Sequence, residues 1–539
     1  MPTITIDDQE VQVEKGTTVI EAAEKLGIYV PRYCYHPGLT VAGSCRMCMV
    51  ELENMPKLAI ACFTEAADGM KVITTSDKVL AGRRNMLEFL LHNHPLDCPV
   101  CDQSGECDLQ NFYMEHGKYQ SRFVENKVKK LKAFPIGPHV VLDQERCILC
   151  TRCTRFCSEV SKSHELGVFD RGDRSVIGLN PGKTLDNPYS GNVIDICPVG
   201  ALTEREFRFQ CRVWYLSSQE SVCPGCSRGC NISIHYNQRL GYKAGGKRVQ
   251  RLKPRFHPHI NQWWMCDQGR FGYQFIDRDR IEFPMLLSGE RLELTGWQEA
   301  LQKGADLLKS TLNEHGPEAV GVIASPQQSN EELYLIRKLF RECLGIENIG
   351  FRNPWEKEGF SDDYLIRADK NPNSRGAEAM ELGGDVKSIL ERAAAGEIRL
   401  LYVFQHDLAA DAEARSLLEK AENLIYQGSN QNETMEMAEL VLPSSTYAEA
   451  DGTFTNFEGR VQQFHQAFLP LSEARAGLEI LLDLARGLEQ DLVYKSAEDL
   501  FMEWFGKQYH ELDEFGEFLP GSGPTPPGVS DGAQARANS

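Results

Sequence analysis

The sequence lacks several features that would identify common classes of protein. No apolar run among its 539 residues approaches the length of a membrane span. The first residues, MPTITIDDQE, contain no basic region followed by an apolar stretch, so we expect no secretion signal. Positive charge is scarce, because 58 Lys and Arg face 77 Asp and Glu and leave a net charge of -19. An acidic chain of this kind is not expected to bind nucleic acid or anionic lipid headgroups.

Nucleotide-binding fingerprints are also missing. No G-x-G-x-x-G follows any predicted strand, so we expect no flavin or nicotinamide site. The fragment GYKAGGK matches G-x4-G-K, but Arg248 stands where a P-loop has its magnesium-binding Ser or Thr. This fragment belongs to a basic stretch with seven Lys or Arg between Arg239 and Arg255. We interpret the stretch as a solvated or subunit-facing edge.

Cysteine, in contrast, is abundant. The chain has 18 cysteines, and without a secretion signal they indicate a reducing, cytoplasmic compartment in which thiolates serve as metal ligands. Fifteen of them, with one histidine, fall by spacing into four sets of four ligands in the first half of the chain. A length of 539 residues predicts roughly three to five domains.

The first set is Cys34, Cys45, Cys48 and Cys62, spaced C-x10-C-x2-C-x13-C. A lone cysteine, a close pair and a distant fourth is the order of a plant-type [2Fe-2S] loop, with structural zinc as the alternative. Before it we predict two strands, residues 3–6 and 11–14, around a turn at residues 7–9. A helix over residues 18–26 should follow, because Thr18 and Glu21 have capping-box spacing.

The second set is His94, Cys98, Cys101 and Cys107, spaced H-x3-C-x2-C-x5-C. Three thiolates leave one corner of a [4Fe-4S] cubane for the imidazole, whose neutrality should raise the reduction potential. His92 is the rival ligand. We favour His94 because Pro95 fixes the chain just beyond it, whereas His92 lies in a helical pattern over residues 85–93.

The third and fourth sets consist of cysteine alone. Cys147, Cys150 and Cys153 form the C-x2-C-x2-C triplet of bacterial ferredoxins, and Cys197, followed by proline, completes a [4Fe-4S] site. The fourth set is spaced C-x2-C-x3-C-x35-C and again suits a cubane; its members are Cys223, Cys226, Cys230 and Cys266. We interpret the three remaining cysteines as buried and structural; they are Cys157, Cys211 and Cys343.

From about Gly296 the pattern alternates between strands and helices. AVGVIAS, RLLYVF and NLIYQG read as strands, each followed by a helical or loop segment. Such alternation predicts a parallel sheet with helices on both faces. The last residues, from LPGSGPTPPG onward, are rich in Pro and Gly and predict a disordered tail.

Five sequence segments together carry a family resemblance: CRMC, HPLDCPVCDQSGECDLQ, RCILCTRCTRFC, DICPVGAL and WWMCDQGR. In this order they resemble the G subunits of bacterial NADH:quinone oxidoreductase, the large iron-sulfur subunits in the peripheral arm of respiratory complex I. The similarity covers roughly residues 1–490. Further along, GWQEAL, PNSRGAEAM and VLPSSTYAEADGTFTNFEGRVQ look like landmarks of a molybdopterin oxidoreductase fold in non-catalytic form.

The resemblance implies a multidomain α+β and α/β chain. Its expected domains are a β-grasp [2Fe-2S] ferredoxin-like domain (1–78), a one-histidine, three-cysteine [4Fe-4S] segment (79–118), a [4Fe-4S] ferredoxin-like domain (119–215), a [4Fe-4S] domain of the molybdopterin oxidoreductase type (216–275), a truncated α/β molybdopterin oxidoreductase-like domain without cofactor (276–516) and a disordered tail (517–539).

The resemblance also implies a function. One [2Fe-2S] and three [4Fe-4S] clusters would pass electrons from a flavin-bearing, NADH-oxidising subunit toward quinone, as part of a proton-translocating complex on the cytoplasmic side of the inner membrane. The cubane of the fourth set is expected to lie off the electron path. The chain itself should hold no NADH or quinone site, no flavin, no molybdopterin and no membrane span.

Two alternatives come from other classes. A molybdenum enzyme such as an NAD-linked formate dehydrogenase shares the four-cluster front end, but active members resemble C-x-K-G after the fourth cluster cysteine, where this chain has Cys266, Asp267 and Gln268. A zinc-stabilised scaffold fits the number of cysteines but not the triplet spacing.

Overall fold

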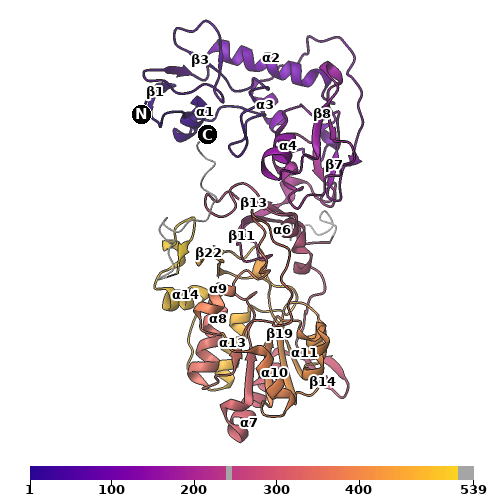
Figure 1. Cartoon of the computed structure of the whole chain (residues 1–539), viewed down its shortest axis with the longest axis vertical. Helices are drawn as coiled ribbons and strands as arrows, with labels where there is room; N and C mark the ends of the chain where they lie inside the picture. The colour runs from indigo at the N-terminus through magenta and orange to yellow at the C-terminus, as the bar shows by residue number, and fades with distance from the viewer. Residues whose placement is uncertain (238–245, 520–539) are drawn as a thin grey trace. The chain divides into compact units, whose positions relative to one another are not determined.

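The computed structural model describes residues 1–237 and 246–519, and these form two compact units (Figure 1). Of the described residues, the first unit contains 1–216 and 246, and the second contains 217–237 and 247–519. Three of the predicted ligand sets therefore lie in the first unit and one in the second. Within the described ranges, no helix combines the length and apolar character that a membrane span requires.

The chain begins with a five-stranded sheet. Its strands follow the order β2 (Gln9–Gln12), β1 (Thr3–Ile6), β5 (Lys71–Ile73), β3 (Met49–Leu52) and β4 (Ala59–Ile60). Asp7 and Asp8 both have positive φ, 44° and 65°, and Ile6 pairs with Gln9, which is the two-residue hairpin turn that matches strand twist. The second strand thus starts two residues earlier than predicted. Helix α1 (Val19–Lys25) has the predicted capping box of Thr18 and Glu21.

Two helices that contact each other follow the sheet. Helix α2 (Asp77–Asn93) starts after Ser76, whose side chain accepts from the Val79 N–H, and His94 is its C-cap. Helix α3 (Asp108–His116) has Cys107 at its N-cap. The helix ends therefore position two predicted ligands of the second set.

The rest of the first unit surrounds the third set. A three-stranded sheet has the order β10 (Leu202–Glu204), β7 (Val140–Leu142) and β6 (Phe134–Pro135), and a separate hairpin joins β8 (Leu166–Phe169) to β9 (Val176–Leu179). Helix α4 (Arg152–Arg155) contains Cys153 and continues into a π-helical turn, Phe156–Val160. Cys197 follows the short helix α5 (Asn192–Asp195).

The second unit opens with an antiparallel sheet, β11 (Ser217–Val222), β12 (Asn231–Tyr236) and β13 (Val249–Pro254). Cys223 follows β11 directly, and Cys230 directly precedes β12. Cys266 caps helix α6 (Asp267–Phe271). The fourth set is thus held where β11 ends and β12 begins, and at the start of a helix.

A seven-stranded sheet forms the main part of the second unit. Its order is β15 (Arg291–Leu294), β14 (Met285–Ser288), β20 (Leu440–Pro443), β19 (Asn423–Gly428), β18 (Leu400–Phe404), β16 (Val320–Ile323) and β17 (Ile349–Gly350). Strands β16 to β20 pair in parallel, whereas β14 and β15 form an antiparallel edge hairpin. The predicted parallel sheet is confirmed.

Helices cover both faces of this sheet, also as predicted. Along β18, Leu400, Tyr402 and Phe404 face one core, and Leu401 and Val403 face the other. The first core includes residues of α7 (Trp297–His315), α8 (Asn330–Ile336), α9 (Ser374–Ala379), α13 (Gly477–Gly487) and α14 (Ala497–Phe505); the second includes residues of α10 (Val386–Ala394), α11 (Ala412–Leu418) and α12 (Glu433–Glu436). The residues of β18 are buried on both sides, which explains its unbroken apolar sequence.

Two predictions in this unit need correction. Cys343 is exposed, not in the core. It lies at the end of a π-helical turn, Arg337–Cys343, which has i→i+5 hydrogen bonds such as Leu344 N–H to Leu339 O. Because this turn departs from 3.6 residues per turn, Cys343 does not lie on the buried face that an α-helical pattern predicts. Residues 517 and 518, predicted to be disordered, form β23 (Glu517–Phe518), which pairs with β22 (Arg460–Phe464) beside β21 (Gly452–Thr455). The rest of the predicted tail, 520–539, lies outside the described residues.

Candidate iron-sulfur sites

The four residues of the first set lie together at one end of the first sheet. The backbone N–H of Cys34 donates to Cys45 Sγ at 3.4 Å. Hydrogen bonds from the thiols of Cys45 and Cys62 lower the pKa of Cys34, and a similar bond to Cys62 lowers the pKa of Cys48. The spacing therefore predicted the right neighbours. The same hydrogen bonds raise the pKa of Cys45 and of Cys62, so the four thiols share their protons and lie close enough to bind one metal group.

Three members of the second set, His94, Cys98 and Cys107, line part of a cavity of about 520 Å³. Cys101 is not in the lining, but it is close to the other two cysteines. Burial and the charge of Cys101 both raise the pKa of Cys107, and burial and the charge of Cys98 both raise the pKa of Cys101. The Nδ1 atom of His94 is buried and has no hydrogen-bond partner. Burial lowers the pKa of His94 to about 4, so the imidazole is in the neutral form that binds metals.

His92 lines the same cavity and is therefore near the set. Its ring packs against Phe123, with ring centroids 4.3 Å apart. A histidine whose ring packs against an aromatic side chain is a weaker candidate for a metal ligand than one with a buried ring nitrogen that has no hydrogen-bond partner. The geometry supports the choice of His94.

The third set lines one small cavity with all four of its thiols, Cys147, Cys150, Cys153 and Cys197. Burial raises the pKa of Cys147 and of Cys197 to about 12, so both are neutral thiols until a cation replaces the proton. Cys157 is fully buried and does not line the cavity, as expected of a structural thiol.

The fourth set likewise lines one small cavity, with Cys223, Cys226, Cys230 and Cys266. The N–H of Gly269 donates to Cys266 Sγ at 3.3 Å. A Cβ at residue 269 would lie 2.9 Å from Cys223 Sγ, so the glycine leaves room for the sulfurs. Burial raises the pKa of Cys266 to about 11.

These donor sets fit iron-sulfur clusters. The third and fourth sets each bring four soft sulfur donors to one small cavity, and the thiols of the first set hydrogen-bond to one another. The second set contains an orphaned imidazole nitrogen that a metal would satisfy. As the side chains stand, no three His, Cys, Asp or Glu of the described residues are placed to hold a metal ion. Of the cysteines outside the sets, Cys211 is buried, as predicted.

Direct contacts join the second and third sets. Asp97, which precedes Cys98, forms an ion pair with Arg146, which precedes Cys147, at 2.7 Å. The Asp108 N–H donates to the Pro198 carbonyl at 3.1 Å. A Cβ at Gly200 would lie only 2.4 Å from Cys101 Sγ, so a loop of the third set leaves room for a ligand of the second.

One hydrophobic core extends along the first three sets. Cys34, Cys107 and Cys150 are members of it, each from a different set. Tyr33 and Phe112 belong to the same core and pack against each other, with ring centroids 5.2 Å apart. The fourth set belongs to a separate core in the second unit.

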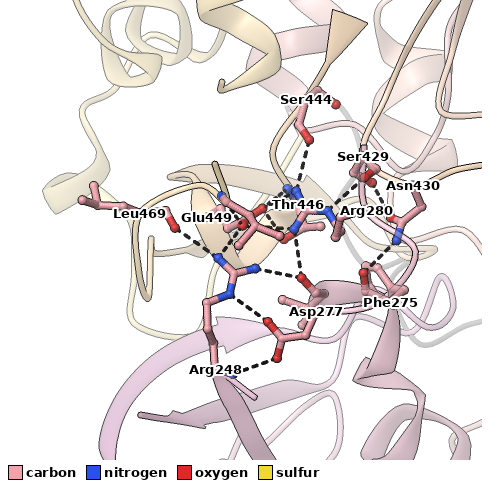
Figure 2. Close-up of polar contacts among 12 residues, drawn as sticks. Arg248, Phe275, Asp277, Arg280, Ser429, Asn430, Ser444, Thr446, Glu449 and Leu469 are labelled. Carbon is pink, nitrogen blue, oxygen red and sulfur yellow. Dashed lines mark hydrogen bonds and ion pairs between the residues drawn. The ribbon is translucent and has the colours of Figure 1, made fainter. Parts of the chain in front are cut away.

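The second unit also contains a buried ion-pair network (Figure 2). Glu449, which is 1% exposed, accepts from Arg248 at 2.7 Å and from Arg280 at 2.8 Å, and Arg248 also binds Asp277 at 2.8 Å. Burial opposes the ionisation of Glu449, but the hydrogen bond and charge of Arg280 outweigh it and lower its pKa.

No pattern in the sequence indicated this network. The sequence predicts a solvated or subunit-facing edge over residues 239–255. For Arg248 and Arg251 the solvated reading is wrong, because Arg248 is largely enclosed and Arg251 is 5% exposed. The partner of Arg248, Glu449, lies 201 residues away, so no local pattern could reveal the pair. Residues 238–245, with most of the GYKAGGK fragment, lie outside the described residues.

A second cavity, of about 320 Å³, lies at the carboxyl ends of the parallel strands in the second unit. Gln405 and Ser429, which follow β18 and β19, line it together with the carboxyl groups of Glu331, Glu332 and Asp451. Burial raises the pKa of Glu332 to about 7. None of the described residues that line this cavity is a Lys or Arg.

Five family models match the chain in succession. They are a 2Fe-2S iron-sulfur cluster binding domain (residues 1–77), an NADH-ubiquinone oxidoreductase-G iron-sulfur binding region (83–122), an NADH-quinone oxidoreductase subunit 3 ferredoxin-like domain (137–203), a molybdopterin oxidoreductase Fe4S4 domain (216–278) and molybdopterin oxidoreductase (280–370 and 369–487). The predicted order of domains is thereby confirmed.

Three curated relatives are all G subunits of NADH-quinone oxidoreductase. The G subunit of Streptomyces coelicolor is 42% identical over 354 residues, which are 65% of this chain and 40% of that protein. The G 2 subunit of Rhizobium meliloti is 34% identical over 92% of this chain and 58% of its own length, and the G subunit of Rickettsia bellii is 39% identical over 64% and 49%. The chain spans about half the length of these three relatives.

Proposed function

This chain belongs to the same family as the NADH-quinone oxidoreductase G subunits, and from this premise we propose that it conducts electrons between iron-sulfur clusters held by its four ligand sets. The ligands are those of the four cysteine and histidine sets described above. When bound, such clusters supply one-electron carriers. The protein residues hold them, exclude water and set their spacing.

The observation that carries this proposal is the shared core of the first three sets. Their ligand loops belong to one packed cluster of side chains, and hydrogen bonds and an ion pair join the second set to the third. Carriers held this way would stay at fixed separations, which a conduit requires. A scaffold that used metal only to fold would have no need for contacts between its sites.

The fourth set has a different role in the proposal. It lies in the other unit and in another core, and we infer that it stabilises the molybdopterin oxidoreductase-like domain and stands off the electron path. The cavity of that domain supports the absence of molybdopterin. Its described lining has three carboxyl groups and no cationic side chain, and so offers no counter-charge to the phosphate that the cofactor carries.

The partners follow from electron counting. NADH delivers two electrons as a hydride, whereas these clusters normally take one each, so a flavin must divide the pair. We propose that a flavin-bearing, NADH-binding subunit supplies the electrons, and that a further iron-sulfur subunit of the same peripheral arm carries them toward quinone. The assembly would lie on the cytoplasmic side of the inner membrane and, as a whole, translocate protons.

Metal analysis of the anaerobically purified chain tests the proposal. We expect about fourteen iron atoms, from one [2Fe-2S] and three [4Fe-4S] clusters, and neither molybdenum nor tungsten. Dithionite should bleach the visible absorbance, and NADH alone should not. Stoichiometric molybdenum would favour the formate dehydrogenase alternative, and rapid bleaching by NADH without an added flavoprotein would reveal a nucleotide site. Zinc in place of iron would indicate a scaffold.

A further inference from the structure

Two arginines of helix α4 contact the first ligand set from within the third. Arg152 donates from Nη2 to the carbonyl of Tyr35, next to Cys34, at 2.6 Å. Its Nη1 donates to the carbonyl of Ile196, next to Cys197, at 3.1 Å. One guanidinium thus connects the two ligand loops.

Arg155 makes the same connection at the ligands themselves. Its Nη2 donates to the carbonyl of Cys34 at 2.5 Å and to that of Cys150 at 3.3 Å. Its Nη1 donates to the carbonyl of Thr40 in the first-set loop. A planar guanidinium can make these bonds at once, whereas a lysine ammonium cannot match their geometry.

Neither guanidinium is paired with a carboxylate. Within the described ranges no Asp or Glu forms an ion pair with Arg152 or Arg155, and their hydrogen bonds go to carbonyl or hydroxyl oxygens. The nearby Glu159 accepts from the N–H and hydroxyl of Thr40 instead. Burial raises the pKa of Asp108, and the charge of Arg152, which alone would lower this pKa, does not outweigh burial. Arg152 is 8% exposed, and a buried charge without a counter-ion is costly.

Two anionic groups would balance these charges. A cluster with four thiolate ligands is net negative, and each arginine lies between two such sets. We propose that Arg152 and Arg155 are positioning residues that hold the first-set loop on the third-set loop, and whose charges raise the reduction potentials of both clusters. Reduction adds one negative charge to a cluster, and a nearby cation stabilises that charge more in an enclosed site than in water. This inference rests on the proposed function.

The test is a redox titration of the cluster-loaded full chain, followed by low-temperature EPR. In Arg155→Gln, which removes the charge, the ratio of reduced to oxidised clusters at a fixed potential should fall about tenfold for the first and third sets, a shift of about 59 mV for one electron. The second and fourth sets should not shift. Arg155→Lys keeps the charge and should leave the potentials unchanged, while its loss of bridging bonds broadens the EPR lines of both clusters. Arg174→Gln, the control, removes one charge at an exposed residue of the same unit and should change nothing.

The outcomes separate this inference from the proposed function. If the unaltered chain shows no [2Fe-2S] and [4Fe-4S] signals, the proposed function fails. If it shows them and Arg155→Gln leaves both potentials unchanged, or shifts all four clusters alike, only the arginine inference fails. Should Arg155→Gln not bind its clusters, Arg155→Lys decides: unchanged potentials in both clusters support the inference, and altered ones overturn it.

Discussion

The two units of the molecule hold their ligand sets in different ways. In the first unit, three sets share one core, and their ligand loops contact one another through Arg155, Arg146 and the backbone of Asp108. In the second unit, the fourth set has no companion, and the same unit holds an acidic cavity and an ion-pair network around Glu449. Contacts between sites suit the transfer of electrons, and contacts between a site and its scaffold suit stability.

This difference predicts that the second unit depends on Glu449 more than on any exposed charge. Glu449→Gln leaves Arg280 buried without a counter-ion and Arg248 with Asp277 alone, which should cost about 3–5 kcal/mol of unfolding free energy. Because the pKa of Glu449 is lowered in the folded chain, its contribution is present above the ordinary pKa and is lost as the pH falls through the folded value. Urea unfolding at pH 7 and at successively lower pH would measure both effects.

The matched control is Glu489→Gln, which removes an exposed partner of Lys309. Such a pair contributes little, so the unfolding midpoint should remain that of the unaltered chain. The [2Fe-2S] signal should also survive Glu449→Gln, since its ligands lie in the other unit. Equal effects of the two substitutions would contradict the role of the network.

Removing one cluster ligand from each unit should show which unit carries the electrons. Cys266→Ala should delete one cubane signal, lower the iron content by about four atoms and leave the other three clusters intact. In an assembled complex it should leave transfer from NADH to quinone largely unchanged. Cys150→Ala, by contrast, should abolish transfer, because the first three sets share a core. Full loss of transfer in an assembled Cys266→Ala complex would mean that the fourth set is on the path.

The smallest expected effect is a change in the reduction potential of the second-set cluster. His94→Cys replaces a neutral ligand by an anionic one, so the cubane should remain while its potential falls by an amount of the order of 100 mV. EPR during a redox titration would follow it. His92→Ala is the control and should leave the potential unchanged. A cluster lost in the His92 variant and unshifted in the His94 variant would reverse the choice of ligand.

Local chemistry explains which features could be predicted from the sequence. The spacing of the cysteines identified neighbours because each set contains a C-x2-C pair, and the capping box at Thr18 and the alternating strands are also local patterns. The role of Arg248 depends on a partner far along the chain, and the exposure of Cys343 depends on a π-helical turn that apolar periodicity does not encode. Long-range pairing and backbone irregularity are therefore where sequence reasoning failed.

Gly200 links two sites that the order of the sequence keeps apart. A single added methyl group there would meet the sulfur of Cys101, although residue 200 belongs by sequence to the segment of Cys197. A change to alanine should thus damage the histidine-bearing site rather than the one whose segment it alters. For Gly200, the site that a substitution damages is therefore predicted by its neighbours in space and not by its position in the sequence.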